Sequence, residues 1–424
     1  MRGCLLGFCD GTDYRKGDSH VADIKKKKIK IIINMKGGLS LSSKIKFIAL
    51  GGGQWHGASC YYIGVDGCNI LLDCGSDSKG GVASGPNLNV LLKYLDSLSE
   101  LDAVLVSHSH FDHIGHLPQF HAVAPNVPIY ATEQSKILAN HLIWDKGGRY
   151  LRMQSRTLVE REEIMAENVL ESIIGTGYAK TIRLPKFEVT FYEAGHIPGA
   201  AMILIETENH RILYTGDFAK QPTPLADGYV VPKNISADTM IVCGTHAVNP
   251  TYTHNFQGRR LVKMHRCLLS EDIVGINITQ LTKGLEIAKL FNDEMESGRM
   301  SAKSIYLDDS IWKLGERLEA MGRSVLGRYC RPIPNSSFKN GVYISDRYVL
   351  NGYAKTYGIN FTLHASYPET KELIYRVNPK TAFIVHTGYT PEYYDRRYMA
   401  LEIRRERGAD ISLIYPENDD VYMI

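Results

Sequence analysis

The chain has 424 residues, of which 44% are hydrophobic and 22% charged, a composition typical of a globular protein. Its 49 Lys and Arg residues nearly balance its 46 Asp and Glu residues, and the resulting net charge of +3 does not by itself indicate nucleic-acid binding. The sequence has no apolar run of the roughly 18 residues that a membrane span needs and no signal-peptide pattern, so we expect a protein that does not associate with membranes.

Residues 1–44 differ from the rest of the chain. They contain the lysine run 25–28 followed by IKIIINMKGGLSLSS, a composition that favours a flexible basic leader. An arm that grips phosphates is the alternative. The eight cysteines of the whole chain are scattered without a Cys-x-x-Cys pair, which indicates reduced thiols in a cytoplasmic protein.

From residue 45 onward the pattern alternates between strands and helices. The sequence KIKFIAL predicts a strand, and a glycine loop followed by a hairpin is expected after it. Further strands and helices are read from the apolar runs and their spacing. The expected elements are a strand at 101–110, a strand and a helix at 127–147, three strands at 187–218 and a strand at 237–248.

Residues 246–345 have the pattern of a small α/β unit. The segment 279–298 places apolar residues at near-helical spacing, and a strand at 304–309 and a second helix at 310–322 follow. After this unit, residues 359–388 predict a strand, a helix and a strand. The last segment, 391–424, predicts a helix and closing strands.

The run VSHSHFDHIGHLP offers four metal ligands within six residues. His108 and His110 are two residues apart, so both side chains point to the same side of an extended turn, and Asp112 and His113 follow directly. Imidazole and carboxylate together suit borderline divalent metals, zinc first. Surface histidines on a loop are the other interpretation, which such a dense cluster does not favour.

Two single polar residues complete the pattern. His196 lies in AGHIPGA and Asp217 in YTGDF, and each closes an apolar strand beside a glycine. Glycine lets the backbone turn sharply and approach a metal. Either residue alone is readily explained as a satisfied polar group of a loop, but together with the first cluster they indicate a metal site.

The order His-x-His-x-Asp-His, a lone His and a lone Asp after Thr-Gly resembles the metallo-β-lactamase fold. The fold class that the resemblance implies is α/β, an αββα sandwich. Asp73 in ILLDCG matches the early aspartate of that family. The resemblance implies that Asp73 orients the metal loop by hydrogen bonds without binding metal, as expected of a buried carboxylate beside ligands.

The carboxyl-terminal part resembles the β-CASP branch of that fold, which contains ribonuclease J and the cleavage-and-polyadenylation endonuclease. FTLHAS and FIVHTG resemble its motifs B and C, and the helical unit lies where that branch inserts its extra domain. The resemblance divides the chain into the leader 1–44, a first part of the metallo-β-lactamase domain at 45–245, an inserted β-CASP-like domain at 246–345 and a closing part at 346–424.

The resemblance also implies two Zn²⁺ ions per chain, with Mn²⁺ as the alternative, that share a hydroxide for in-line displacement. Asp217 would bridge the two ions, Asp112 would also be catalytic, and His364 of motif B would act as general acid. The first ion would take His108, His110, His196 and Asp217. The second would take Asp112, His113, Asp217 and His386.

The sequence departs from the resembled branch at motif A. In that branch, motif A is an acidic residue that ends the strand before the insert. Cys243 occupies that position, and a neutral thiol cannot hold an imidazolium as a carboxylate can. Thr245 or His246 could orient His364 instead. Cys243 itself is expected to be a buried small side chain rather than a nucleophile.

The insert is short for the branch, and its charge is mixed. Basic residues there form either a solvated face or strips that contact phosphates. The glycine loop 51–53 is either a phosphate cradle or a tight turn at the rim of the site. The candidate strips are Arg259, Arg260, Lys263 and Arg266, and Arg323, Arg328 and Arg331.

Three functions are compatible with these residues. Histidine at motif C favours a phosphodiesterase or ribonuclease that cleaves RNA, since RNA-cutting members of the resembled branch carry histidine there. The degenerate motif A and the short insert favour a metallo-hydrolase for a small molecule such as a cyclic nucleotide, ester or lactone. A metal-binding module without catalysis is the third. The resemblance also implies RNA as the substrate partner and a homodimer as one form of assembly.

Overall fold

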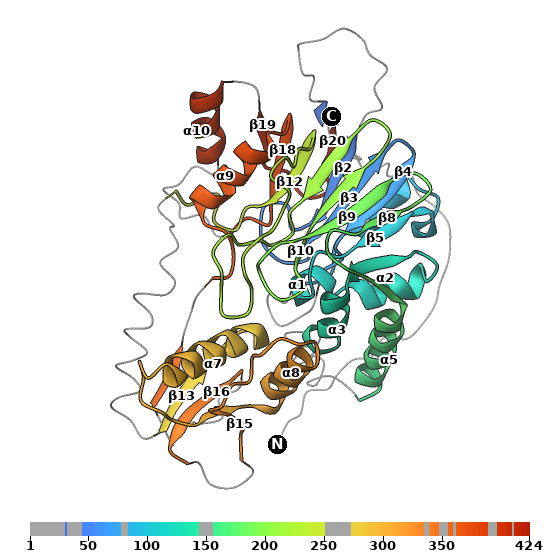
Figure 1. Ribbon diagram of the computed structural model, residues 1–424. Helices are drawn as coiled ribbons and strands as arrows, with labels where there is room; N and C mark the ends of the chain where they lie inside the picture. Colours follow the sequence, from blue (N-terminus) through green and yellow to red (C-terminus); the bar gives the residue numbers. More distant parts are fainter. Residues whose placement is uncertain are drawn as a thin grey trace, which may run out of the picture.

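The computed structural model describes residues 30–31, 45–77, 84–143, 156–250, 273–334, 339–346, 355–358, 362–388, 397–408 and 411–424. Two mixed β-sheets lie face to face and form the body of the molecule, and a smaller unit with its own sheet lies at one end of it (Figure 1). This arrangement confirms the fold class expected from the sequence, an αββα sandwich with an inserted α/β unit.

The first sheet is formed by β1 (Lys30–Ile31), β2 (Lys46–Gly51), β3 (Cys60–Val65), β4 (Cys68–Leu72), β5 (Ala103–Leu105), β6 (Ile129–Thr132), β7 (Ile173–Thr176) and β20 (Val421–Met423). The strand order is β1-β20-β2-β3-β4-β5-β6-β7. Strands β2 to β4 are antiparallel, which confirms the predicted hairpin. Strands β4 to β7 are parallel and short, and the apolar runs of β4, β5 and β6 fit burial on both faces.

The second sheet is formed by β8 (Thr181–Arg183), β9 (Glu188–Glu193), β10 (Ala201–Glu206), β11 (Arg211–Tyr214), β12 (Thr239–Cys243), β18 (Thr381–Val385) and β19 (Ser412–Ile414). The order is β19-β18-β12-β11-β10-β9-β8. Strands β12 and β18 are neighbours although about 140 residues separate them in the chain. The closing segment therefore adds strands to the sheet that the first part began.

The space between the two sheets is filled by apolar side chains from both. The rings of Phe47 on β2 and Phe383 on β18 stack with their centroids 4.0 Å apart. Helices cover the outer faces, with α2, α3 and α5 beside the first sheet and α9 and α10 beside the second (Figure 1). The helices of the body are α1 (Phe111–Ile114), α2 (Leu117–Val123), α3 (Glu133–Leu142), α5 (Arg156–Ser172), α9 (Tyr367–Val377) and α10 (Tyr398–Arg407). Two 3-10 helices lie at Leu88–Lys93 and Leu98–Glu100.

The inserted unit has a third, parallel sheet with the order β15-β14-β16-β13-β17. Helix α8 begins where the Asp308 carboxylate accepts hydrogen bonds from the backbone of Ser310 and Ile311. The bounds are Ile273–Asn277 (β13), Leu281–Glu296 (α7), Ile305–Leu307 (β14), Asp309–Ala320 (α8), Cys330–Pro332 (β15), Gly341–Ser345 (β16) and Lys355–Gly358 (β17).

This unit is packed onto the body by one continuous apolar cluster. Leu285 and Ile287 of α7 belong to the same cluster as Met240 of β12 and Phe218. The buried carboxyl group of Glu286 adds polar contacts, because it accepts hydrogen bonds from the Thr223 hydroxyl and the Leu225 backbone. Helix α7 therefore has a fixed position relative to the second sheet.

Two sequence predictions change in the structure. The third sheet continues past the predicted boundary at residue 345, since β17 pairs with β13; the short sequence KTYG gave no apolar pattern to read. Residues 362–366, predicted as the end of a strand, form a loop, because the backbone groups of Leu363 and Ala365 bond instead to His196 and Phe218.

Most of the predicted leader lies outside the described residues. The exception is β1, which pairs in parallel with β20 at the edge of the first sheet. Among the described helices, none combines the length and apolar character that crossing a bilayer requires.

Candidate metal centre

The predicted ligands lie at one edge of the two sheets, most of them in loops and two of them, Asp112 and His113, in the short helix α1. His108 and His110 follow β5, Asp217 follows β11, and His386 follows β18. His196 follows β9, which has the same direction as β11 because each is antiparallel to β10. Equivalent ends of the strands in each sheet meet at one edge, so ligands that are far apart in the chain converge there.

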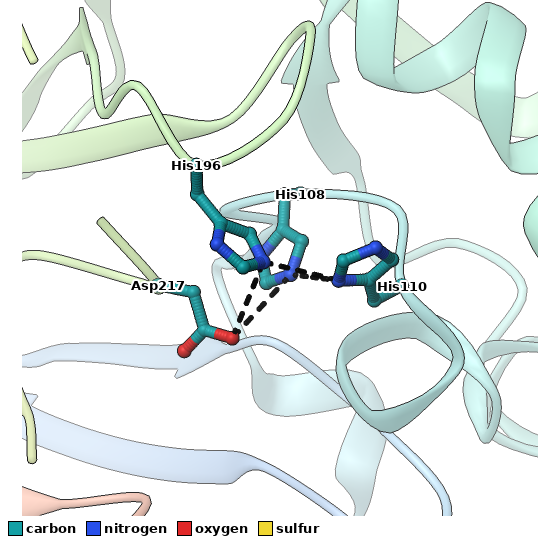
Figure 2. Close-up of side chains that lie close together, drawn as sticks. All are labelled: His108, His110, His196 and Asp217. Atoms are coloured by element: carbon teal, nitrogen blue, oxygen red, sulfur yellow. Dashed lines mark hydrogen bonds and ion pairs between the residues drawn. The ribbon is translucent and has the colours of Figure 1, made fainter. Parts of the chain in front are cut away.

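The first group of side chains contains His108, His110, His196 and Asp217, and its four ligand atoms lie within 4.8 Å of one another. Nδ1 of His110 is 3.1 Å from Nε2 of His108 and 3.2 Å from Nε2 of His196. Oδ2 of Asp217 is 3.7 Å from each of the same two Nε2 atoms. Figure 2 shows the three rings and the carboxylate pointing toward one another.

The second group contains Asp112, His113 and His386, again within 4.8 Å. Nε2 of His386 lies 3.8 Å from Oδ2 of Asp112. The two groups share a neighbour, because Oδ2 of Asp217 is 3.5 Å from Nε2 of His113 and 3.7 Å from Nε2 of His386. One carboxylate oxygen therefore faces both sets of imidazoles.

The five histidines of the two groups each have a partner for the ring nitrogen that points away from the centre. The partners are the Asp73 carboxylate for His113 at 2.7 Å, the Ser107 hydroxyl for His108 at 3.1 Å, the Ser59 hydroxyl for His386 at 2.8 Å, the Leu363 carbonyl for His196 at 2.8 Å and the Thr282 hydroxyl for His110 at 3.1 Å. Such partners fix the ring orientation and tautomer of a metal-binding histidine. The hydrogen bond of the outward nitrogen therefore fixes the position of the inward nitrogen in each ring.

The residues fit a divalent cation in three respects. A tetrahedral ion with Zn–N bonds of about 2.0–2.1 Å holds its ligand atoms about 3.3 Å apart, close to the separations of the first group. Nε2 of His113 and Oδ1 of Asp217 are buried without a hydrogen-bond partner, which is costly unless an ion satisfies them. Three imidazoles and a carboxylate are also the donors that zinc prefers.

The pKa shifts agree with this fit. Burial, together with neighbouring imidazoles, lowers the pKa of His108 and His110 well below the usual histidine value, so both are neutral, the form that binds metal. Burial opposes ionisation of Asp217, but His386, His364 and His113 outweigh it and hold the pKa of this carboxyl well below its usual range. Burial lowers the pKa of His113, but Asp217 and Asp73 raise it well above the usual value; a bound cation would take the place of that proton.

His364 also lies next to Asp217, with its Nδ1 3.5 Å from Oδ2. The hydroxyl of Thr245 is 3.2 Å from the same Nδ1, and Sγ of Cys243 is 3.9 Å from it. His246 bonds instead to the hydroxyl of Thr362, at 2.9 Å. Of the residues weighed as replacements for the motif A acid, Thr245 is therefore the one whose side chain lies within hydrogen-bond distance of His364.

The thiol of Cys243 is buried beside this histidine. Burial and the Asp217 charge raise its pKa well above the usual value, so the thiol is neutral. Burial also lowers the pKa of His364 well below its usual value, with Asp217 acting in the opposite direction. A phosphate beside His364 would raise that pKa again, since an opposite charge favours the imidazolium.

The glycine loop 51–53 is a tight turn that supports motif C. The Gly52 carbonyl accepts hydrogen bonds from the backbone of His386 at 2.6 Å and from the Tyr61 hydroxyl at 3.0 Å. The Gly53 amide donates to the side chain of Asn418. Gly52 has a φ of +68° and no room for a side chain beside Tyr61. The interpretation as a turn is therefore favoured over a phosphate cradle.

Of the two basic strips, the one at 259–266 lies outside the described residues. In the other strip, Arg323 donates to the Leu225 carbonyl and lies near Glu193, so it holds the inserted unit to the body. Arg331 donates to the backbone carbonyls of Arg328 and Cys330. A phosphate-binding role for Arg328 and Arg331 stays a prediction.

Sequence reasoning missed several residues that orient the ligands. Ser107 precedes His108 directly, and Ser59 follows the glycine loop, so their positions gave a weak signal. Thr282 is 172 residues from His110, and nothing in the sequence links the two. Asp73 and His386 also have positive φ values of 58° and 51°, a backbone strain that becomes visible only in the structure.

Comparison with known proteins agrees with this geometry. Residues 53–264 match the family model described as the metallo-beta-lactamase superfamily. The chain is 27% identical over 285 residues to the transcription termination factor FttA of Methanothermobacter thermautotrophicus. This alignment covers 63% of this chain and 42% of the relative. It is 30% identical over 213 residues to the endoribonuclease ysh-1 of Neurospora crassa, covering 49% of this chain and 24% of the relative. The chain thus spans less than half the length of either curated relative.

A solved structure shares the fold. The crystal structure of a protein of unknown function from Enterococcus faecalis V583 aligns with a TM-score of 0.59 and 15% sequence identity, covering 90% of this chain and all of that one. At this identity the likeness concerns the fold alone.

Proposed function

Because the chain belongs to the metallo-beta-lactamase superfamily, in its β-CASP-like branch, we propose that it is a two-zinc phosphodiesterase that cleaves RNA. The observation that carries this proposal is the position of Asp217. Its Oδ2 faces His108 and His196 on one side and His113 and His386 on the other, at 3.5–3.7 Å. A single carboxylate between two ligand groups fits two divalent ions that share it, and Mn²⁺ is the alternative to Zn²⁺.

The chain itself supplies positioning, charge and a proton carrier. Two zinc ions bound here would supply an activated water and a clamp for the scissile phosphate. Asp217 and Asp112 offer the negative charge that holds such ions, and the imidazoles supply neutral nitrogens. His364 lies at the rim of this group, 22% exposed, where it can meet a leaving oxygen and hand over a proton. Thr245 holds Nδ1 of His364, which leaves the other ring nitrogen for the substrate.

RNA is the proposed substrate because one relative is named an endoribonuclease and motif C carries His386. The cytoplasm and a homodimer are the location and the assembly that we propose for the chain. The described cysteines are all buried thiols without a disulfide, which fits a reducing compartment such as the cytoplasm. A homodimer is the assembly that the family resemblance suggests.

The test combines metal content with cleavage. We expect about two zinc ions per chain by elemental analysis and cleavage of a labelled single-stranded RNA by the wild type. The double variant Asp112→Ala/His113→Ala should lose cleavage. His210→Ala is the matched control, because it removes an imidazole from the β10–β11 turn, away from the centre. Full cleavage by the double variant, or a chain that binds no zinc, would overturn the proposal.

A second candidate is a hydrolase for small phosphodiesters, esters or lactones. It is favoured by Cys243, which stands where the resembled branch carries the acidic residue of motif A. Salt dependence separates the two, since RNA contacts release counterions and weaken steeply with salt. Binding that is insensitive to salt, with turnover of a small phosphodiester but no RNA cleavage, would favour this candidate.

A further inference from the structure

We propose that Thr282 of the inserted unit is a positioning residue for the first metal, acting through His110. This proposal rests on the metal binding of the proposed function. The hydroxyl Oγ1 of Thr282 lies 3.1 Å from Nε2 of His110, and both side chains are buried. The other four outward nitrogens have partners in the segments around the two-sheet body, at Asp73, Ser107, Ser59 and Leu363. His110 alone among these histidines has its partner in the inserted unit.

The contact selects one tautomer of His110. Its Nδ1 is the atom that faces the centre, at 3.1 Å from His108 and 3.2 Å from His196. Metal binding needs a lone pair on Nδ1, so the ring proton must be on Nε2. That N–H then donates to the Thr282 hydroxyl, which acts as acceptor. A side chain without an oxygen here would leave a buried N–H unpaired when the metal binds, which is costly.

The position of Thr282 is fixed by the packing of its helix. Thr282 is in the first turn of α7, whose neighbours Leu281 and Leu285 are buried in the shared apolar cluster. Gly284 in the same turn is closely packed, because a Cβ there would lie 2.8 Å from the end of the Ile278 side chain. Glu286 ties the helix to the body through Thr223 and Leu225. The hydroxyl is therefore presented to His110 by a rigid element.

The arrangement couples the inserted unit to the metal. If the Thr282 bond strengthens metal binding, then metal binding must hold α7 in place by the same free energy. The inserted unit would then contribute to the metal centre itself and not only to the surface around it.

The experiment measures zinc affinity of the full chain by competition with a chelator. Thr282→Val keeps the shape and removes the hydroxyl, and we expect one of its two zinc affinities to fall about 10–100-fold. Thr282→Ser keeps the hydroxyl and should stay within about threefold of the wild type. Thr190→Val is the matched control, because it removes a buried hydroxyl that pairs with Thr181 at the far edge of the second sheet. Circular dichroism of the metal-free proteins checks that each variant is folded.

A second measurement needs no variant. Hydrogen exchange of the wild type should show that zinc slows exchange in the first turns of α7. A folded Thr282→Val that keeps wild-type zinc affinity, or α7 exchange that zinc leaves unchanged, overturns the proposal. A wild type that binds zinc but cuts no RNA defeats only the proposed function, because neither readout here depends on cleavage.

Discussion

Nδ1 of His113 lies 2.7 Å from Oδ2 of Asp73, and both side chains are buried. The same oxygen also accepts hydrogen bonds from the hydroxyls of Ser107 and Tyr214, at 2.7 and 2.6 Å, while Oδ1 accepts from the Ser107 backbone at 2.6 Å. Asp73 therefore connects the end of β4, the metal loop after β5 and the end of β11. The orienting role that the family resemblance assigned to it matches this geometry.

Asp73→Asn should weaken metal binding without removing a ligand. The amide group would face donors from Ser107, Tyr214 and His113, so a buried mismatch of about 1–3 kcal/mol is expected. We expect zinc affinity to fall about 10–100-fold, measured by chelator competition. Tyr214→Phe removes only one of these bonds and should have a smaller effect. Equal zinc affinities for Asp73→Asn and the wild type would show that Asp73 serves the fold alone.

Asp217 and Asp112 should differ in how many ions depend on them. Asp217→Asn alters the carboxylate that faces both ligand groups, so we expect it to lose both metals. Asp112→Asn touches only the second group and should reduce the content from about two ions per chain to about one. Elemental analysis of the purified variants gives these numbers directly. If both variants retain the same metal content, the assignment of Asp217 as the shared ligand is incorrect.

Thr245 should matter more to catalysis than Cys243. The Thr245 hydroxyl is 3.2 Å from Nδ1 of His364 and the Cys243 thiol is 3.9 Å away. Thr245→Val should lower kcat for RNA cleavage about 10–100-fold while KM changes little, because His364 loses its orientation.

Two further variants control for this prediction. Thr245→Ser should recover most of the activity, and Cys243→Ala should stay within about threefold of the wild type. The reverse ranking, with Cys243→Ala the more damaging, would assign the orientation of His364 to the thiol.

Glu286 should make stability depend on pH. Burial raises the pKa of this carboxyl from 4.5 to about 8, although the bonds from Thr223 and Leu225 act in the opposite direction. Between pH 4.5 and 8 the folded chain keeps a proton that the unfolded chain loses, so unfolding releases a proton and becomes easier as the pH rises. This contribution to stability is complete below pH 4.5 and decreases by about 1 kcal/mol for each pH unit up to 8.

Glu286→Gln removes the titrating group and keeps a neutral hydrogen-bonding side chain. Its unfolding free energy relative to the wild type should therefore improve as the pH rises from 5 to 8. Denaturant unfolding of both proteins at several pH values, with the metal removed, measures this difference. A difference that is constant with pH would mean that Glu286 is already ionised in the folded chain.

The sequence predicted the parts of this protein that depend on neighbours in the chain. His108, His110, Asp112 and His113 are recognisable because a buried strand ends and four ligands follow it at once. The hairpin β3–β4 and the helix α7 are recognisable by their apolar periods, since each face of a strand or helix must be either buried or exposed. His196 and Asp217 were found because each ends an apolar strand beside glycine.

The tertiary structure decided which distant groups meet. Thr282 reaches His110, Thr245 rather than His246 reaches His364, and Gly52 supports His386 through its carbonyl. A single hydrogen bond between side chains more than a hundred residues apart leaves no period, run or spacing in the sequence. Such a bond depends on how β12 and β18 pair and on how α7 packs against the body. The sequence therefore predicted the metal ligands, whereas most of the groups that orient these ligands were identified only from the tertiary structure.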